Sequence, residues 1–224
     1  MSIPNLTLLA PRDTRQIRQA VRATLKLDGP CVVQYPKEGI EPYAQNVTGE
    51  PFAVGKWQTL IPGGQDAVIL AYGRMTQNAI QASELLVQRG LSVGVIDCCS
   101  LKPLDMDCLR ALFERKAKIV TIEEGEMIGG FGSEIARVCV EENADAPVQI
   151  IGLENRFITH GSVPELLREF SDYRMLLYSI VLIVILLRRN RRRQGEQSCR
   201  IRNGLTSRWW SAGWRRVGKR HRRW

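Results

Sequence analysis

The residues best suited to chemistry lie in one glycine-rich stretch, KIVTIEEGEMIGGFGSE, at residues 118–134. A strand-like run ends in the acidic pair Glu123 and Glu124, and a helix-like segment follows the glycines. Free N–H groups at a helix N-terminus can hold a phosphate or another anion, and glycine lets the backbone approach closely. The stretch is therefore a phosphate site, a tight turn or part of a larger site.

The glycine spacing favours a turn. GGFG matches neither GxGxxG nor GxxxxGK[ST], the spacings of nucleotide-binding loops. Glu123 and Glu124 end a predicted strand, at the edge where open α/β sheets place functional groups. With Gly129 and Gly130 they are candidates for an active-site border or a subunit interface, and a solvated role is the alternative.

Cysteine and histidine usage argues against a metal centre. The chain has six cysteines without a CxxC spacing and only two histidines, His160 and His221. The N-terminus, MSIPNLTLLAPRD, has neither the basic region nor the long apolar run of a signal peptide. Because reduced cysteines are typical of the cytosol, the sequence predicts a cytoplasmic protein.

The elements that would position these residues begin with a strand-helix-strand unit at residues 6–35. Asp13 is the expected helix N-cap, and Ile17, Val21 and Leu25 recur at four-residue spacing, which places them on one face of the predicted helix. Two strands and one helix leave sheet edges and apolar faces uncovered. We therefore expect the rest of this unit to be missing or to come from another chain.

Residues 65–170 read as a complete α/β domain. Apolar strands alternate with helices, which predicts a three-layer fold around a mostly parallel sheet. The expected strands are 67–73, 91–98, 118–124 and 148–153, and the expected helices are 76–90, 105–116, 133–144 and 163–170. Residues 40–64 are expected to be a linker, with one strand around AVGKWQTLI.

Residues 171–224 form a basic tail of different composition. The tail holds 15 of the 32 Lys and Arg residues but only two of the 23 Asp and Glu residues. An apolar run at 175–187 is shorter than the roughly 20 residues of a membrane-spanning helix, although 175–193 could anchor at a membrane surface. The tail is thus expected to be a non-homologous, unstructured extension, with membrane association or nucleic-acid binding as alternatives.

Four ordered motifs carry a family resemblance over roughly residues 4–170. They are YPKEG (35–39), DCCSLKPLD (97–105), TIEEGEMIGGFGSEI (121–135) and GLENRFITHG (152–161). Their order and separation resemble the C-terminal third of the 1-deoxy-D-xylulose-5-phosphate synthases, which are thiamine-diphosphate enzymes of the transketolase family. By this resemblance, residues 1–39 are the end of the pyrimidine-binding domain and 65–170 are the transketolase C-terminal domain.

The resemblance implies a transferase that condenses pyruvate with glyceraldehyde 3-phosphate for isoprenoid and thiamine synthesis. In the family motif RYPRG the second basic residue holds the triose phosphate group, and its place is taken here by Lys37, next to Tyr35. Lysine keeps the charge but loses the bidentate geometry of arginine. Gln34 replaces the first arginine, and Cys99 stands where the family motif RFVKPLD has its arginine. His160 matches the family's HG, for which a structural or interface role is expected.

The resemblance also implies what this chain must obtain elsewhere. Family members bind thiamine diphosphate and magnesium through a GDG motif and a following Asn in an N-terminal domain, and no GDG occurs in this sequence. We therefore expect no activity from this chain alone, and either a homodimer or a complementing chain with the N-terminal synthase domains. A membrane-tethered α/β scaffold module and a nucleic-acid binder using the tail are the alternatives, the latter less favoured.

Overall fold

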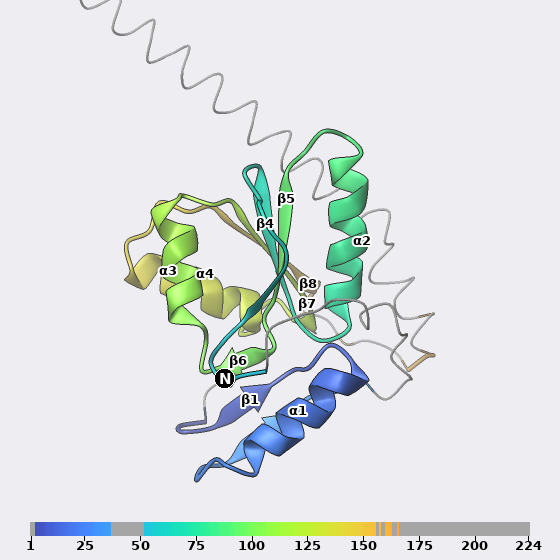
Figure 1. Ribbon diagram of the computed structural model, residues 1–224, viewed down its shortest axis with the longest axis vertical. Coiled ribbons are helices and arrows are strands. Elements are labelled where there is room, and N and C mark those ends of the chain that lie inside the picture. Colours follow the sequence, from blue (N-terminus) through green and yellow to red (C-terminus); the bar gives the residue numbers. More distant parts are fainter. Residues whose placement is uncertain (1–2, 37–51, 156, 158–159, 163–164, 166–224) are drawn as a thin grey trace, which may run out of the picture. The chain divides into compact units, whose positions relative to one another are not determined.

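The computed structural model describes residues 3–36, 52–155, 157, 160–162 and 165. These residues form two β-sheets and four α-helices. Figure 1 shows them in chain order, from α1 in blue to β8 in yellow-brown.

The larger sheet has five strands in the order β3-β5-β4-β7-β8. Its strands are β3 (Gln58–Ile61), β4 (Ala67–Ala71), β5 (Val93–Asp97), β7 (Ile119–Glu126) and β8 (Val148–Leu153). Only β3 pairs antiparallel, at the edge beside β5, and the other pairings are parallel. Every residue of β4 and β5 is buried, which is why both strands read as unbroken apolar runs.

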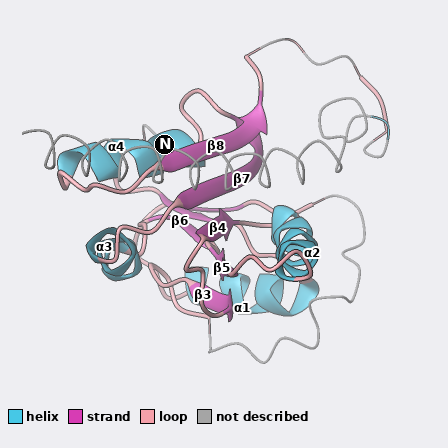
Figure 2. Ribbon diagram, turned by 90° about the horizontal axis from the view of Figure 1, so that it is seen from above, coloured by secondary structure: helices cyan, strands magenta, loops and turns pink. Residues whose placement is uncertain are grey.

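Helices cover both faces of this sheet, so the predicted three-layer, mostly parallel architecture is confirmed. α2 (Met75–Val87) lies on one face, while α3 (Met106–Glu114) and α4 (Phe131–Glu141) lie on the other, as Figures 1 and 2 show from two directions. α3 begins at Asp105, whose carboxylate accepts a hydrogen bond of 3.1 Å from the N–H of Cys108. A side-chain acceptor at this position satisfies one of the unpaired N–H groups of the first turn.

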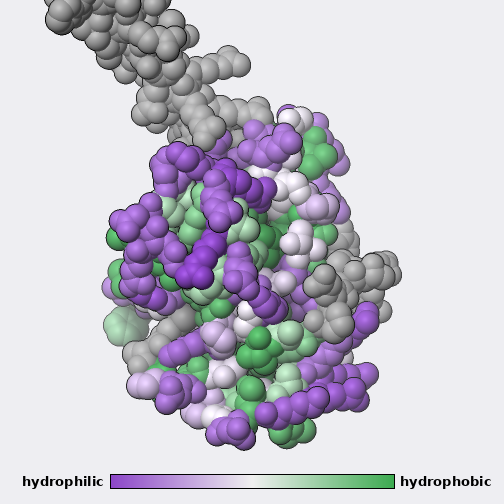
Figure 3. Space-filling view, turned by 60° about the vertical axis from the view of Figure 1, so that its left-hand side comes forward, coloured by the Kyte–Doolittle hydropathy of each residue, from purple (hydrophilic) through white to green (hydrophobic). Residues whose placement is uncertain are grey.

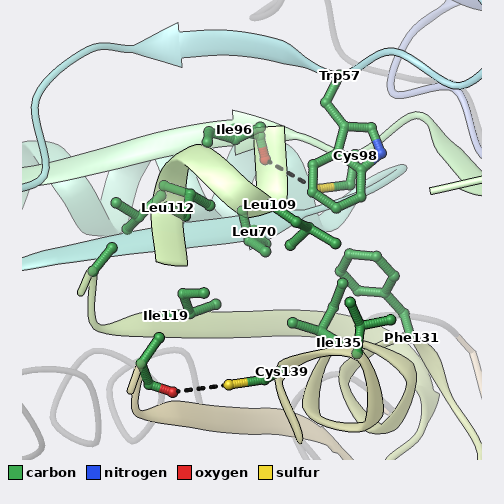
Figure 4. Close-up of a cluster of buried hydrophobic side chains, with 14 of the residues drawn as sticks. Trp57, Leu70, Ile96, Cys98, Leu109, Leu112, Ile119, Phe131, Ile135 and Cys139 are labelled. Carbon is green, nitrogen blue, oxygen red and sulfur yellow. Dashed lines mark hydrogen bonds between the residues drawn. The ribbon is translucent and has the colours of Figure 1, made fainter. Parts of the chain in front are cut away.

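The main hydrophobic core lies between the sheet and the α3 and α4 layer. Phe131 and Ile135 of α4 meet Leu109 of α3 and Leu70 of β4 there, and all four side chains are at most 1% exposed (Figure 4). Burying one side chain of this size contributes about 1.5–3 kcal/mol. This core holds the start of α4 rigidly against the end of β7.

The N-terminal unit forms a second, three-stranded sheet in the order β2-β1-β6. Its elements are β1 (Thr7–Leu9), α1 (Thr14–Thr24), β2 (Cys31–Val33) and β6 (Ser100–Lys102). β1 and β2 are parallel, whereas β6 joins β1 antiparallel and comes from the DCCSLKPLD motif of the C-terminal domain. The sequence analysis did not predict β6, and this strand continues the small sheet on the β1 side.

The predicted N-cap of α1 is confirmed, and the aliphatic residues that share one face of this helix are largely exposed. Asp13 caps the helix, because its carboxylate accepts a hydrogen bond of 2.7 Å from Gln16 N–H. The side chains buried along α1 are Gln16 and Ala20, whereas Val21 is 46% exposed and Leu25 is 82% exposed. A buried polar partner for Gln16, described below, explains why a glutamine displaces the aliphatic stripe from the packed face.

Several predicted elements lie wholly or partly outside the described residues. The strand expected around 53–61 appears as β3, within the segment predicted to be a linker. The closing helix at 163–170 is described only at Glu165, whose carboxylate accepts hydrogen bonds from the N–H (2.9 Å) and hydroxyl (2.7 Å) of Ser162. The tail at 171–224 is outside the description altogether. Each helix in the described ranges is too short or too polar to span a lipid bilayer.

Candidate functional site

The glycine-rich turn is built around the side chain of Glu123, which is 4% exposed and lies within β7, three residues before the strand ends at Glu126. One carboxylate oxygen accepts a hydrogen bond of 2.9 Å from Phe131 N–H, and the other accepts one of 2.8 Å from Gly132 N–H. These are the first two amides of α4. A negative charge at this position is favourable because of the helix dipole. The anion site suggested by the sequence is therefore filled by a carboxylate of the same chain.

Burial sets the protonation behaviour of this turn. It raises the pKa of Glu123, and the hydrogen bonds from Gly132 and Phe131 oppose that shift. Tyr72 has its pKa raised by burial first, and then by the charges of Glu123 and Glu124. Its ring packs edge-on against Phe131 with centroids 5.6 Å apart. The Tyr72 ring and the Glu123 carboxylate therefore both contact the first turn of α4.

The glycines of the turn are required by close packing. A Cβ at Gly130 would collide with the Glu126 carbonyl and the Glu123 carboxylate, and a Cβ at Gly132 would collide with Thr121. Gly129 has a φ of +75°, a conformation that L side chains rarely adopt. The glycines therefore bring the helix N-terminus onto Glu123, which supports the turn reading of GGFG.

The start of α4 does not fit a diphosphate. The two amides that could hold a phosphate at the start of α4 already bind Glu123. Within the described ranges there is also no group of three or more His, Cys, Asp or Glu side chains that could hold a metal ion. No reaction step through thiamine diphosphate can therefore be assigned to these residues.

The other predicted site residues make no hydrogen bond to the Glu123 carboxylate among the described contacts. Glu124 forms an ion pair of 3.5 Å with Arg74, and Gly129 is an exposed turn residue. His160 is exposed beyond the end of β8. Tyr35 is 63% exposed just after β2, and Lys37 lies outside the described residues. The interface and substrate-binding roles of these residues stay predictions.

The sequence analysis missed a buried polar network that connects the N-terminal unit to the five-stranded sheet. Arg12 forms an ion pair with Asp97 and also donates a hydrogen bond of 2.7 Å to Gln58. Gln16 donates one of 2.7 Å to Asp97, and its side-chain oxygen accepts one of 2.7 Å from Arg12 N–H. Arg12, Gln16, Gln58 and Asp97 are each at most 7% exposed. We call these four residues the Arg12 network.

Asp97 is the centre of the Arg12 network and is completely buried. Burial raises its pKa, and the charge of Arg12 and the hydrogen bond from Gln16 act in the opposite direction. An ion pair in such a place stabilises the fold only while both partners are present. One sequence signal could have found it, because an aspartate that ends the apolar strand VGVID requires a polar partner.

Comparison with known proteins agrees with the fold. The transketolase C-terminal domain family matches residues 55–171. The 1-deoxy-D-xylulose-5-phosphate synthase of Thermus thermophilus is 36% identical over 168 residues, which are 75% of this chain and 26% of the synthase. The synthase of Listeria monocytogenes is 38% identical over 172 residues, 75% of this chain and 28% of the synthase. The chain thus spans about a quarter of the length of these curated relatives.

Solved structures give the same architecture. One described as an inactive β4 tetramer of a split-gene transketolase has a TM-score of 0.72 at 30% identity, and the match covers 83% of this chain and 60% of that one. A transketolase from Pichia stipitis, with a TM-score of 0.58 and 18% identity over 83% of this chain and 26% of that one, shares the fold. The order of its motifs, its three-layer fold and the family match over residues 55–171 agree. This chain belongs to the transketolase C-terminal domain family and resembles the C-terminal part of the 1-deoxy-D-xylulose-5-phosphate synthases.

Proposed function

We propose that this chain is the C-terminal part of a 1-deoxy-D-xylulose-5-phosphate synthase that is inactive alone and needs a complementing chain. The complete enzyme would condense pyruvate with glyceraldehyde 3-phosphate, using thiamine diphosphate and magnesium, and would feed isoprenoid and thiamine synthesis. The complementing chain would carry the cofactor-binding N-terminal domains.

One observation carries the proposal: an incomplete N-terminal unit is attached to a complete C-terminal domain. β1 pairs with β6 of the C-terminal domain, and the buried Arg12–Asp97 ion pair joins the same two parts. The N-terminal unit by itself has only β1, α1 and β2, too few elements to bury its own apolar surface. The N-terminal unit is therefore firmly attached to the C-terminal domain but has too few elements of its own. This is expected if another polypeptide supplies the rest of its sheet.

The two residues proposed to contact the substrate, Tyr35 and Lys37, come shortly after a strand of the small sheet. Tyr35 lies two residues after the last residue of β2, at the carboxyl end of the small sheet, which is the usual location of ligand contacts in open α/β sheets. Lys37 follows two residues later, and we assign it to the phosphate group of glyceraldehyde 3-phosphate. His160, Glu124 and Gly129 are assigned to the border with the complementing chain.

A partner requirement has support among the structural relatives. The split-gene transketolase is described as inactive in the form of a β4 tetramer. This chain covers 60% of it at 30% identity. By analogy, self-association of this chain would give no activity, and activity would need the missing domains.

Reconstitution tests the proposal directly. The full chain would be mixed with the part of the Thermus thermophilus synthase that it does not match, together with thiamine diphosphate and magnesium. We expect 1-deoxy-D-xylulose 5-phosphate only when both polypeptides are present. Turnover by this chain alone would contradict the proposal, and so would a stable complex without turnover.

The membrane and nucleic-acid alternatives depend on residues 171–224, which lie outside the described residues. No described contact favours either alternative. The cytoplasmic location also stays a prediction from the sequence.

A further inference from the structure

The side chains that join the N-terminal unit to the C-terminal domain lie in the interior of the protein. On the face that Figure 3 shows, hydrophilic residues in purple surround small groups of hydrophobic residues in green, whereas Arg12 and Asp97 are only 5% and 0% exposed. A buried ion pair holds its two partners together, because leaving either charge unpaired in the interior is strongly unfavourable. The Arg12 network can therefore fix the position of the backbone next to it.

The backbone just before Arg12 lies where strands of both sheets end. Ala10, which follows β1, donates a hydrogen bond of 2.8 Å from its N–H to the Cys99 carbonyl, two residues after β5. The Ala10 carbonyl accepts one of 3.2 Å from the N–H of Gly73, two residues after β4. The carboxyl ends of β1, β4 and β5 thus meet at Ala10, and the carboxyl ends of parallel strands are where α/β proteins usually place functional residues.

The segment after β2 is attached to the same place. Gln34 donates a hydrogen bond of 2.8 Å from its N–H to the Leu9 carbonyl, so the pairing of β2 with β1 continues one residue beyond β2. Tyr35 and Pro36 follow, and Lys37 is next in the sequence. We call Gln34–Pro36 the β2 exit. Because its first residue is bonded to the last residue of β1, a displacement of the end of β1 displaces the β2 exit as well.

Arg12 anchors this end of β1 to the larger sheet. It lies three residues after Leu9, forms the ion pair with Asp97 and donates the hydrogen bond of 2.7 Å to Gln58. Gln58 and Asp97 are direct partners in the pairing of β3 with β5. The two anchoring side chains therefore come from neighbouring positions of one sheet, which gives Arg12 a fixed point of attachment.

We propose that Arg12 is a positioning residue, which aligns the β2 exit with the carboxyl ends of β4 and β5 and so sets the place of Lys37 at the substrate phosphate. The alignment of the β2 exit concerns this chain alone, whereas its consequence for glyceraldehyde 3-phosphate rests on the proposed function. Arg12 is assigned no contact with the substrate, because its charge is paired with Asp97.

Residue-resolved hydrogen exchange of the full-length chain tests the alignment. In Arg12→Met we expect the Gln34 amide, which bonds to β1 near the Arg12 network, to exchange at least tenfold faster than in wild type. The Thr7 amide, which is bonded at the opposite end of the same strand pair, should change less than twofold. Arg110→Met, which removes an ion pair at the surface, is the matched control and should leave both amides unchanged.

Kinetics of the reconstituted assembly test the consequence for the substrate. Arg12→Met should raise the KM for glyceraldehyde 3-phosphate at least threefold and leave the KM for pyruvate within twofold of wild type, because only the first substrate carries a phosphate group. A purely structural role would lower the amount of active enzyme, and with it the apparent kcat, without separating the two KM values. Arg12→Lys keeps the charge beside Asp97 and should have a smaller effect in both experiments.

The outcomes separate the positioning role from the proposed function. Equal acceleration of the Gln34 and Thr7 amides, or an unchanged Gln34 amide, overturns the alignment. Equal changes in the two KM values overturn the consequence for the substrate phosphate. Absence of turnover in the wild-type assembly overturns the proposed function, and hydrogen exchange then decides the alignment by itself. Thermal unfolding checks that each variant is folded at the temperature of measurement, and Arg12→Lys replaces Arg12→Met if that variant is not.

Discussion

At Glu123 the chain itself supplies the anion that its helix N-terminus would otherwise attract. Two glycines leave room for the carboxylate that caps α4, because a Cβ at Gly125 or Gly130 would collide with it. The glycine pattern that resembles a ligand site is therefore explained by internal capping. A glycine-rich turn after a strand should be searched for a nearby acidic residue before a phosphate is assigned to it.

Glu123→Gln is expected to destabilise the chain by about 1–3 kcal/mol. The glutamine oxygen can still accept one amide hydrogen bond, but its NH₂ group would face the second amide N–H, which loses its acceptor. Chemical denaturation measures the free energy of unfolding. Glu126→Gln, an exposed acid on the same strand, is the control and should unfold like wild type.

The same variant gives a pH dependence with a defined sign. Because burial raises the pKa of Glu123 above its ordinary value of 4.5, folding favours the protonated form. The stabilisation that Glu123 provides is therefore largest below pH 4.5 and falls as the pH rises through the folded-state pKa. The difference in unfolding free energy between wild type and Glu123→Gln should shrink in that direction. A difference that grows with pH would contradict the burial argument.

At the scale of elements, the Arg12 network fixes where α1 begins relative to the larger sheet. Arg12 precedes α1, Gln58 belongs to β3 and Asp97 ends β5. Backbone pairing of β1 with β6 adds a second connection between the same two parts. The N-terminal unit and the C-terminal domain are therefore expected to unfold together.

Arg12→Met should cost about 3–5 kcal/mol of stability, because it leaves the buried Asp97 carboxylate without its charge partner. The double variant Arg12→Met, Asp97→Asn should recover part of this loss, since the unpaired charge is removed. Arg110→Met is the matched control, because Arg110 pairs with Glu142 on the surface and is 55% exposed. Urea denaturation with two probes, one in each part, tests both the size of the loss and the joint unfolding. Equal losses for Arg12→Met and Arg110→Met would contradict the assignment.

At the scale of the whole molecule, the chain has one complete domain and one incomplete unit. The C-terminal domain has helices on both faces of its sheet, whereas the N-terminal unit keeps an open strand edge and an exposed aliphatic stripe. Under the proposed function, activity belongs to the assembly with the complementing chain, so a substrate-site variant is measured in that assembly.

In the reconstituted enzyme, Lys37→Gln should raise the KM for glyceraldehyde 3-phosphate by about 10- to 100-fold, the effect of losing one charge-assisted contact. The KM for pyruvate should change little, because pyruvate has no phosphate group. Lys116→Gln, at an exposed lysine paired with Asp145, is the control. A rise in both KM values would indicate damage to the assembly instead of a phosphate contact.

The sequence alone determined the types and order of the elements described in the complete domain, apart from the short strand β6. The helix over 105–116 was predicted from its apolar spacing and appears as Met106–Glu114, and the strand predicted at 148–153 matches β8 residue for residue. These features depend on neighbours a few positions apart, such as the Asp13 cap of α1. The motif order also indicated the family, because motifs are read directly from the residues.

Only the tertiary structure decided which side chains are buried together. Asp97 meets Arg12 across 85 positions of sequence, and α1 packs through Gln16, which reaches Asp97, while Val21 and Leu25 stay exposed. Glu123 could be placed at the edge of the sheet from sequence, but its capping of α4 depends on how the turn folds back. Periodicity records local geometry, whereas burial is set by contacts between distant segments, and for this reason the sequence could name these residues but could not pair them.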